Sequence, residues 1–210
     1  MSNSKFIVID GIDGSGKATQ VELLKKYFDE EGIDYLAISF PRYDQNVYGD
    51  LVRRYLLGEF GEINEVDPHL AATLYAGDRI LAKKEIEKAL NSGKTVIADR
   101  YVSSSKAHLS ANLPEEKREE FIQWVDKLEY ETNGVPREDL TFFLNVTPEV
   151  SQKLADRDDI HERDLDHLQK AHGVYLKLAQ NPNWKVIECM NGDQLRTPED
   201  ISQEIISKIT

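Results

Sequence analysis

The chain has 210 residues and a mass of 24.0 kDa, which fits one domain with a sizeable core, so we expect a single domain over residues 1–210. Its net charge of −12 opposes binding to nucleic acid or to an anionic membrane, because either requires a basic face. No apolar stretch approaches a membrane span, and the first residues resemble neither a signal peptide nor a transit helix, so we expect a cytoplasmic protein. The single cysteine, Cys189, excludes an internal disulfide, and its apolar surroundings predict that it is buried.

Short apolar runs rich in β-branched residues alternate with longer stretches of helical periodicity. We expect strands at residues 5–9, 35–39, 95–98, 141–146 and 184–189. We expect helices from 17 to about 30, from 68 to about 90, at 115–130, at 161–180 and from 197 onward. This alternation predicts an α/β fold of three layers, in which a five-stranded parallel sheet is flanked by helices. Ligands of such sheets bind beyond the carboxyl ends of the strands.

Residues typical of helix ends mark several of these boundaries. Gly32 follows the first helix and favours a C-terminal cap, because glycine readily adopts the left-handed conformation. Asp67-Pro68 predicts an N-terminal cap with proline in the first helical turn. Thr197-Pro198 begins a similar cap for the last helix.

A glycine-rich segment follows the first strand and opens the first helix. The glycines let backbone N–H groups turn toward phosphate oxygens, and the start of the helix adds donors and a dipole. Lys17 supplies a positive charge that can reach the β- and γ-phosphates. This spacing between a strand and a helix predicts a P-loop NTPase fold rather than a turn without a ligand. We expect the segment to bind ATP through Gly11, Ile12, Asp13, Gly14, Ser15, Gly16, Lys17, Ala18 and Thr19.

The residue after Lys17 departs from the phosphate-loop pattern. The pattern has serine or threonine there as a Mg²⁺ ligand, whereas this chain has Ala18 followed by Thr19. One step along a helix turns a side chain by about 100°, so Thr19 does not simply replace that ligand. Mg²⁺ normally keeps several waters, so we expect it to be held through water, phosphate oxygens and a carboxylate elsewhere. We expect Asp99, after the third strand, to be that carboxylate, acting through water.

Cations near the strand ends indicate a second, anionic substrate. Arg100 can hold a phosphate through a bidentate fork, and Arg42 follows the second strand in the segment Phe40-Pro41-Arg42-Tyr43. A hydroxyl acceptor requires a carboxylate base, whereas a phosphate monoester, with a second pKa of about 6, requires cationic clamps instead. The segment offers Arg42, with Asp44 as the nearest carboxylate, and therefore favours an anionic acceptor.

Two residues of the helix after Pro68 form a candidate base site. Tyr75 and Arg79 lie four residues apart and so share a face of the helix. The ring can stack on a flat base and the guanidinium can bond its edge, although a tyrosine in such a position often belongs to the core.

Taken together, these segments resemble the thymidylate kinases over nearly the whole chain. The resemblance rests on Asp13 in the phosphate loop, on Asp99-Arg100-Tyr101 followed by small polar residues, and on Thr73-Leu74-Tyr75-Ala76-Gly77-Asp78-Arg79. The segment Phe40-Pro41-Arg42-Tyr43 matches the family's acceptor-phosphate segment. The resemblance implies phosphorylation of dTMP to dTDP by ATP with Mg²⁺, and it implies a homodimer.

The resemblance also implies roles for individual residues at the dTMP site. Asp13 meets the 3′-hydroxyl, Arg42 and Arg100 hold the acceptor phosphate, and Tyr75 stacks on thymine, whose O4 Arg79 contacts. Ser104 and Ser105 lie near the pyrimidine edge, and His108 stands where the family has tyrosine. The implied dTMP-binding set is Asp13, Phe40, Pro41, Arg42, Tyr43, Tyr75, Arg79, Arg100, Ser104, Ser105, His108 and Glu162.

A lid at about residues 154–163 completes the implied catalytic machinery. Thymidylate kinases supply a charge-stabilising arginine either in the phosphate loop or in this lid. Because the loop here has Gly14, the resemblance assigns that role to Arg157 or, as the alternative, to Arg163. The implied catalytic set is therefore Lys17, Arg100 and Arg157, and Glu162 closes on the bound nucleotide.

Other functions remain open at this point. The acceptor could be another nucleoside monophosphate or a deoxynucleoside. A nucleotide-binding switch that hydrolyses ATP slowly is an alternative of a different class. A second site for a base and a phosphate, which such a switch does not need, argues against that alternative.

Overall fold

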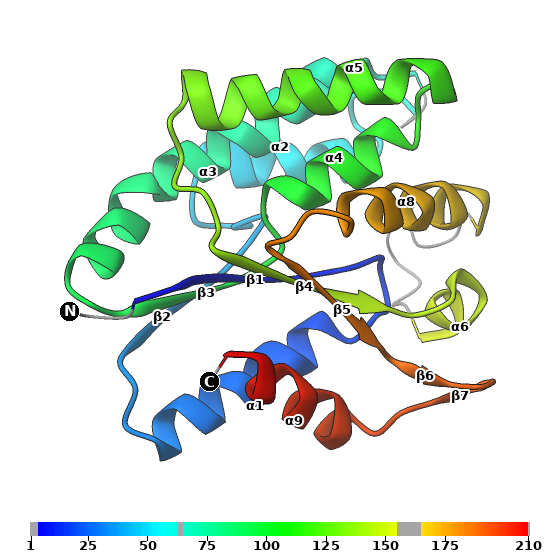
Figure 1. The fold of residues 1–210 in the computed structure, drawn as a ribbon. Helices are drawn as coiled ribbons and strands as arrows, with labels where there is room; N and C mark the ends of the chain where they lie inside the picture. Colours follow the sequence, from blue (N-terminus) through cyan, green and yellow to red (C-terminus); the bar gives the residue numbers. More distant parts are fainter. Residues whose placement is uncertain (1–3, 63–64, 155–164, 210) are drawn as a thin grey trace.

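A five-stranded parallel sheet forms the centre of the protein (Figure 1). The structure is a computed structural model and describes residues 4–62, 65–154 and 165–209. The strands lie in the order β2-β3-β1-β4-β5, and every neighbouring pair in this sheet is parallel. Their bounds are β1 Phe6–Asp10, β2 Tyr35–Ser39, β3 Thr95–Asp99, β4 Leu140–Asn145 and β5 Trp184–Glu188. The predicted α/β fold with five parallel strands is confirmed.

Helices cover both faces of the sheet (Figure 1). On one face lie α1 (Lys17–Glu30) and α9 (Pro198–Ile209), which contact each other. On the other face lie α2 (Val47–Leu56), α3 (Pro68–Asn91), α4 (Val102–Ser110), α5 (Glu115–Asp126) and α8 (Leu165–Leu178). A short helix, α6 (Pro148–Leu154), follows β4, and a hairpin of β6 (Met190–Asn191) and β7 (Gln194–Leu195) follows β5.

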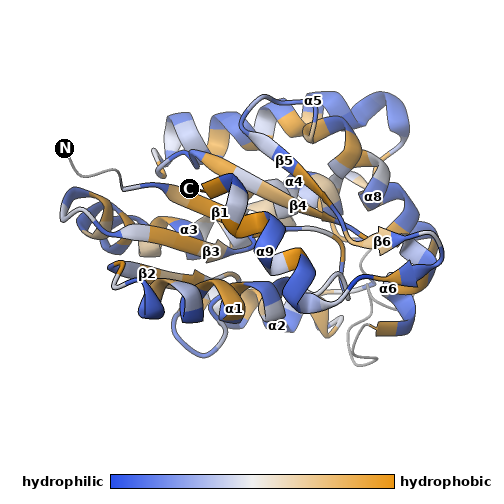
Figure 2. Cartoon of the chain, turned by 60° about the horizontal axis from the view of Figure 1, so that its bottom comes forward, coloured by the Kyte–Doolittle hydropathy of each residue, from blue (hydrophilic) through white to orange (hydrophobic). Residues whose placement is uncertain are grey.

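Alternation along the strands produces a separate core on each face. In β1, Phe6 and Val8 join the cluster under α3 and α4, whereas Ile7 and Ile9 join the cluster under α1 and α9. All five residues of β1 are buried because the strand lies in the middle of the sheet, and the strands are mostly apolar in Figure 2. The edge strand β2 is only partly buried. A run that is apolar at every position therefore marks a central strand.

Two glycines allow α2 and α3 to approach closely. A Cβ on Gly77 would lie 2.3 Å from the ring of Tyr48, and a Cβ on Gly49 would lie 2.1 Å from the carbonyl oxygen of Arg42. Since neither space admits a side chain, these glycines set the distance between the two helices and the segment after β2.

The predicted elements agree with the structure, with some differences at their boundaries. The expected strands shift by at most one residue, and Asp67 and Thr197 accept the hydrogen bonds of helix caps, from His69 N and Asp200 N. The helix expected over 115–130 divides into α5 and a π-helical turn, η1 (Lys127–Thr132). Of the helix expected over 161–180 the structure describes α8, and residues 161–164 lie outside the described residues.

Helices α2, α4 and α6 and the hairpin of β6 and β7 were not expected from the sequence. Helix α2 has a recognisable start, because the side chain of Asn46 accepts hydrogen bonds from Tyr48 N and Gly49 N, each at 3.0 Å. Asparagine is a preferred N-cap residue, so this signal was available.

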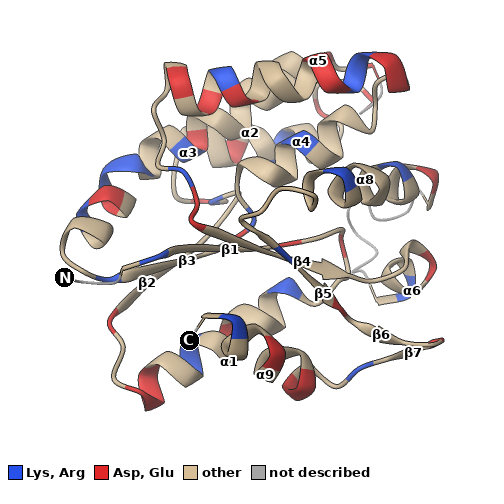
Figure 3. Cartoon of the chain, in the orientation of Figure 1, with Lys and Arg blue, Asp and Glu red and all other residues tan. Residues whose placement is uncertain are grey.

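Charged residues lie mainly on the helices and scarcely on the strands of the sheet (Figure 3). Within residues 4–62, 65–154 and 165–209, no helix is long and apolar enough to span a bilayer. Cys189 is buried, as expected, and this burial raises the pKa of its thiol to about 12.

Candidate active site

The carboxyl ends of three strands bring the predicted site residues together. Asp99 pairs with Ile9 of β1 on one side and with Ser39 of β2 on the other. The chain continues in register for one more residue, because Arg100 N donates to Ile9 O at 3.1 Å and Phe40 N donates to Asp99 O at 3.0 Å. The phosphate loop, the Asp99-Arg100 pair and the segment after β2 are therefore neighbours at one edge of the sheet.

The phosphate loop folds around the ammonium group of Lys17. Lys17 Nζ donates to Gly11 O at 3.0 Å and to Ile12 O at 2.7 Å. Gly16 has φ 85° at the start of α1, and Gly11 has φ 154°, where a Cβ would lie 2.7 Å from Ser15 Oγ. Both glycines are required by backbone conformations that side chains rarely adopt.

Lys17 carries its charge at an electrostatic cost in the free protein. Burial is the main reason that the pKa of Lys17 falls from 10.5 to about 8, and the nearby charge of Arg100 lowers it further. Asp13, Asp99 and Asp10 act in the opposite direction. A bound anion favours the charged lysine. The loop therefore gains most from a ligand that carries negative charge.

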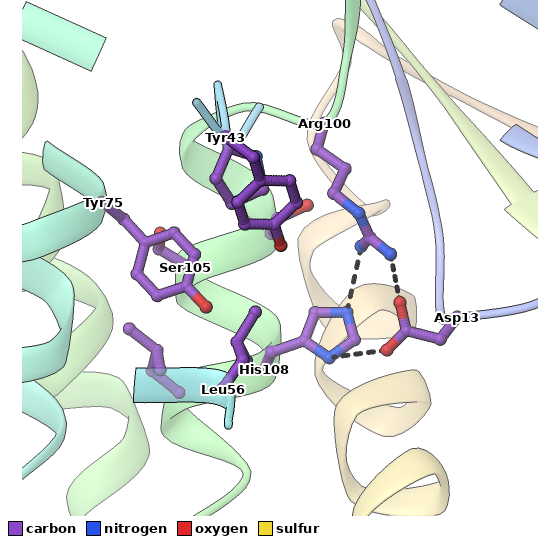
Figure 4. Close-up of a pocket in the computed structure, with 10 residues that line it drawn as sticks. Asp13, Tyr43, Leu56, Tyr75, Arg100, Ser105 and His108 are labelled. Carbon is purple, nitrogen blue, oxygen red and sulfur yellow. Dashed lines mark hydrogen bonds and ion pairs between the residues drawn. The ribbon is translucent and has the colours of Figure 1, made fainter. Parts of the chain in front are cut away.

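Arg100 projects into the space beside the phosphate loop. Its φ of 63° lies in the left-handed region, which is strained for residues other than glycine and is found preferentially at active sites. Its guanidinium forms an ion pair with Asp13 and lies 3.5 Å from His108 Nε2 (Figure 4). Burial acts to lower the pKa of Arg100, but Asp13 and the other anions around it prevail and raise the pKa above its usual value. Arg100 therefore keeps its charge.

Two neighbouring cavities meet at Arg100. The larger, of about 680 Å³, extends along the phosphate loop and past Asp99 to the residues after β5. The smaller, of about 70 Å³, lies between α2, α3 and α4 (Figure 4). Both cavities are lined by Asp13, Pro41, Tyr43 and Arg100. The other residues that line the smaller cavity are Leu56, Tyr75, Ser104, Ser105, His108 and Leu109.

Most of the predicted acceptor residues lie at these cavities, but two arginines lie behind the walls. Arg42 donates from Nε to Asp78 Oδ1 at 2.9 Å and from Nη2 to Asp78 O at 2.8 Å. Arg79 is buried and donates to Glu129 and Ser105. Neither arginine is among the described residues that line the two cavities. Phe40 is buried at the edge of the larger cavity.

Comparisons with known proteins identify the family. The family model for thymidylate kinase matches residues 9–201. The chain belongs to the thymidylate kinase family.

The relatives match over most of their length. The thymidylate kinase of Mycobacterium tuberculosis strain H37Rv is 36% identical over 183 residues, which cover 83% of this chain and 85% of that protein. A probable thymidylate kinase of Pyrobaculum aerophilum is 32% identical over 207 residues, covering 97% and 95% of the two chains. A structure of thymidylate kinase from Candida albicans superposes with a TM-score of 0.78 at 23% identity, over 98% of this chain and 91% of that one, which supports the fold. The predicted enzyme class, a nucleoside monophosphate kinase, is confirmed.

The structure adds residues that sequence reasoning missed at this thymidylate kinase site. Asp10 is fully buried and accepts hydrogen bonds from Ser103 Oγ, from Ser104 Oγ at 2.7 Å and from Tyr175 OH at 2.7 Å. It thereby links β1, α4 and α8 directly behind the site. An aspartate at the end of an otherwise apolar strand is a signal that could have identified it.

Four residues of the C-terminal part also line the larger cavity, namely Leu195 of β7, Arg196, and Pro198 and Ile201 of α9. The side chain of Arg196 pairs with Glu204 at 2.6 Å. No motif in the sequence pointed to them as site residues, because only the fold brings the segment after β5 next to the phosphate loop.

The described residues fit a magnesium ion that is held mainly by ligands other than protein. Within residues 4–62, 65–154 and 165–209 no group of three His, Cys, Asp or Glu side chains could hold a metal ion by itself. Asp99 lines the larger cavity together with Ala18 and Thr19, and burial raises the pKa of its carboxyl above the usual value. A carboxylate at the phosphate loop suits Mg²⁺ that keeps waters and phosphate oxygens as its other ligands.

The predicted lid residues Arg157, Glu162 and Arg163 lie outside the described residues. Leu154, at the end of α6, lines the larger cavity, so the chain enters the predicted lid segment beside the phosphate loop.

Proposed function

We propose that this protein is a single cytoplasmic kinase domain that transfers the γ-phosphoryl group of ATP to dTMP. The proposal is supported chiefly by the two cavities that meet at Arg100 and Asp13, one along the phosphate loop and the other beside Tyr75. A nucleotide-binding switch needs only the first cavity. Membership of the thymidylate kinase family supports dTMP as the acceptor.

In the proposed mechanism each cavity holds one substrate. The phosphate loop and Lys17 bind the donor phosphates, and Tyr75 faces the acceptor base. Arg100, which lines both cavities, holds the acceptor phosphate in line with the γ-phosphate. The acceptor oxygen is already ionised near pH 7, so no residue has to act as a general base. Catalysis then consists of positioning and electrostatic stabilisation.

The ion pair between Arg100 and Asp13 would change when the substrates bind. Arg100 is paired with Asp13, and the resemblance assigns Asp13 to the 3′-hydroxyl of the acceptor. A phosphate in the smaller cavity offers Arg100 a second anionic partner. Asp99 would hold Mg²⁺ through water, and the ion would supply positive charge to the donor phosphates. Arg157 keeps its predicted role in the lid.

A coupled assay with a panel of acceptors tests this function. We expect ADP release with dTMP to exceed that with dUMP, CMP, AMP and thymidine, and to require Mg²⁺. Release of ADP at the same slow rate with every acceptor and with none would support the nucleotide-binding switch and contradict the proposal.

We also propose a homodimer, formed through the outer face of α2 and α3. Large apolar side chains are exposed there, including Val47 at 64%, Leu70 at 65% and Leu81 at 52%. Exposed apolar surface of this kind is typical of an interface. Sedimentation of the wild type as a dimer, and of a Leu70→Glu/Leu81→Glu variant as a monomer, is the expected result, and a monomeric wild type would contradict it.

A further inference from the structure

A buried ion pair lies behind the wall of the smaller cavity. Arg79 of α3 donates to the same oxygen of Glu129, Oε1, from Nε at 2.8 Å and from Nη2 at 2.5 Å. The two side chains are only 2% and 1% exposed. Burying both charges is costly, so the pair calls for an explanation beyond stability.

A π-helical turn presents Glu129 to Arg79. Helix α5 changes at Lys127 into η1, in which Asn133 N donates to Leu128 O, five residues earlier, at 2.9 Å. Such turns are rare and occur frequently at functional sites.

The hydroxyl group of Ser105 connects this ion pair to the smaller cavity. Arg79 Nη2 also donates to Ser105 Oγ at 2.7 Å. Ser105 lines the smaller cavity together with Tyr75 and is itself 3% exposed (Figure 4). A guanidinium can only donate, so Ser105 Oγ is the acceptor in this contact. Within the described parts of the chain, the Ser105 hydroxyl accepts this bond and donates none to another residue.

We propose that Glu129 is a positioning residue that locks Arg79 and thereby presents the Ser105 hydroxyl to the acceptor base as a hydrogen-bond donor. The proposal rests on the acceptor site described above and deepens it. Because Arg79 occupies one side of Ser105 Oγ, the hydroxyl hydrogen is directed toward the cavity. The wall then favours a base that offers an acceptor at this point, such as the 4-keto oxygen of thymine or uracil.

A pyrimidine with an amino group at position 4 binds less favourably beside Ser105. The amino group of cytosine can donate to the remaining lone pair of Ser105 Oγ, but the hydroxyl hydrogen then stays buried without an acceptor. An unsatisfied buried polar group of this kind corresponds to about a 10- to 100-fold loss of affinity. dUMP and dCMP differ only at position 4 and in the proton on N3, so their ratio of kcat/KM isolates this contact.

Substitutions of Glu129 test the proposal in the full-length protein. In Glu129→Leu we expect KM for dUMP and dTMP to rise about 10-fold or more, with KM for ATP unchanged, and the dUMP:dCMP ratio of kcat/KM to collapse toward one. Glu129→Gln keeps an oxygen acceptor for Arg79, and no described residue bonds the Oε2 that its amide nitrogen replaces. We therefore expect this conservative variant to restore the wild-type ratio.

Glu138→Gln is the matched control. Glu138 is a partly buried carboxylate close by in the chain that accepts a hydrogen bond from Tyr130 OH at 2.7 Å and does not contact Arg79. We expect its dUMP:dCMP ratio to equal that of the wild type.

A double-mutant cycle covers the case in which Glu129→Leu leaves Arg79 buried without its partner and the chain does not fold. Replacing both members of a buried ion pair by apolar residues is often tolerated, so Arg79→Leu/Glu129→Leu is compared with Arg79→Leu alone. Since Glu129 acts through Arg79, its replacement should not change the dUMP:dCMP ratio further in that background. Thermal melting of each variant reports folding separately.

Two results overturn the proposal. One is a folded Glu129→Leu protein with the wild-type dUMP:dCMP ratio, and the other is a further change of the ratio when Glu129→Leu is added to Arg79→Leu. Failure of the proposed function has a different signature, because the wild type itself then phosphorylates neither dTMP nor dUMP.

Discussion

Replacing Lys17 by methionine should remove ATP binding and yet leave the free protein at least as stable as the wild type. The pKa of the buried ammonium group is lowered from 10.5 to about 8, mainly by burial. A pKa difference of one corresponds to about 1.4 kcal/mol, so carrying the charge in the folded state costs about 3 kcal/mol near pH 7. Methionine has a similar length and carries no charge.

Part of this gain is offset by lost hydrogen bonds. The carbonyl oxygens of Gly11 and Ile12 lose their donor, at about 1 kcal/mol each. We therefore expect Lys17→Met to be more stable by about 1 kcal/mol, which raises the melting temperature of a chain of this size by about 2–4 °C. With ATP at 100 times its Kd the wild type should gain about 3 kcal/mol, and the variant almost nothing.

Thermal melting at pH 7, with and without ATP and Mg²⁺, measures both effects. Lys26→Met, on the exposed side of the same helix, is the control and should melt close to the wild type in both conditions. The pH dependence has a defined sign. Because the unfolded chain binds more protons between pH 8 and 10.5, the wild type regains stability relative to the variant over that range. A variant that melts several degrees below the wild type without ATP would refute the argument from burial.

Three further predictions concern the site and the fold. ATP binding at pH 9 should take up close to one proton, since the anion raises the lowered pKa of Lys17, and calorimetry in buffers of different ionisation enthalpy detects it. Arg100→Ala should slow transfer by about 10²–10³-fold while the chain stays folded, and substantial residual activity would count against the mechanism. Gly77→Ala should destabilise the protein by about 1–3 kcal/mol in denaturant unfolding, because the new methyl group meets Tyr48. Gly173→Ala, which meets nothing within 4 Å, should be neutral or stabilising, and equal effects would contradict the packing argument.

Much of the fold and of the phosphate loop was predicted from local sequence patterns. The apolar runs of the strands, the glycines around Lys17 and the caps at Asp67 and Thr197 are signals that lie within a few residues of one another. Each depends on backbone conformation or on burial of a whole segment, which a short stretch of chain can specify. For the same reason the start of α2 could have been predicted from Asn46, which caps that helix.

The partners of the arginines were not predictable in this way. Arg42 bonds Asp78, and Arg79 bonds Glu129, across 36 and 50 residues of sequence respectively. Among several carboxylates on each helix, the register of packing decides which one meets which guanidinium. Nothing local to Glu129 indicates its role, because the contact between η1 and α3 that brings it to Arg79 joins segments far apart in the chain.

The amino-acid sequence alone determined the five strands of the sheet and the helices α1, α3, α5, α8 and α9 along the chain, the phosphate loop and the chemistry available at the strand ends, because these depend on neighbouring residues. Only the tertiary structure decided that Arg100 pairs with Asp13, that Arg42 and Arg79 lie behind the cavity walls, and that Asp10 joins three elements. These outcomes depend on distances between segments far apart in the chain, and those distances are set by how the two cores pack on the sheet.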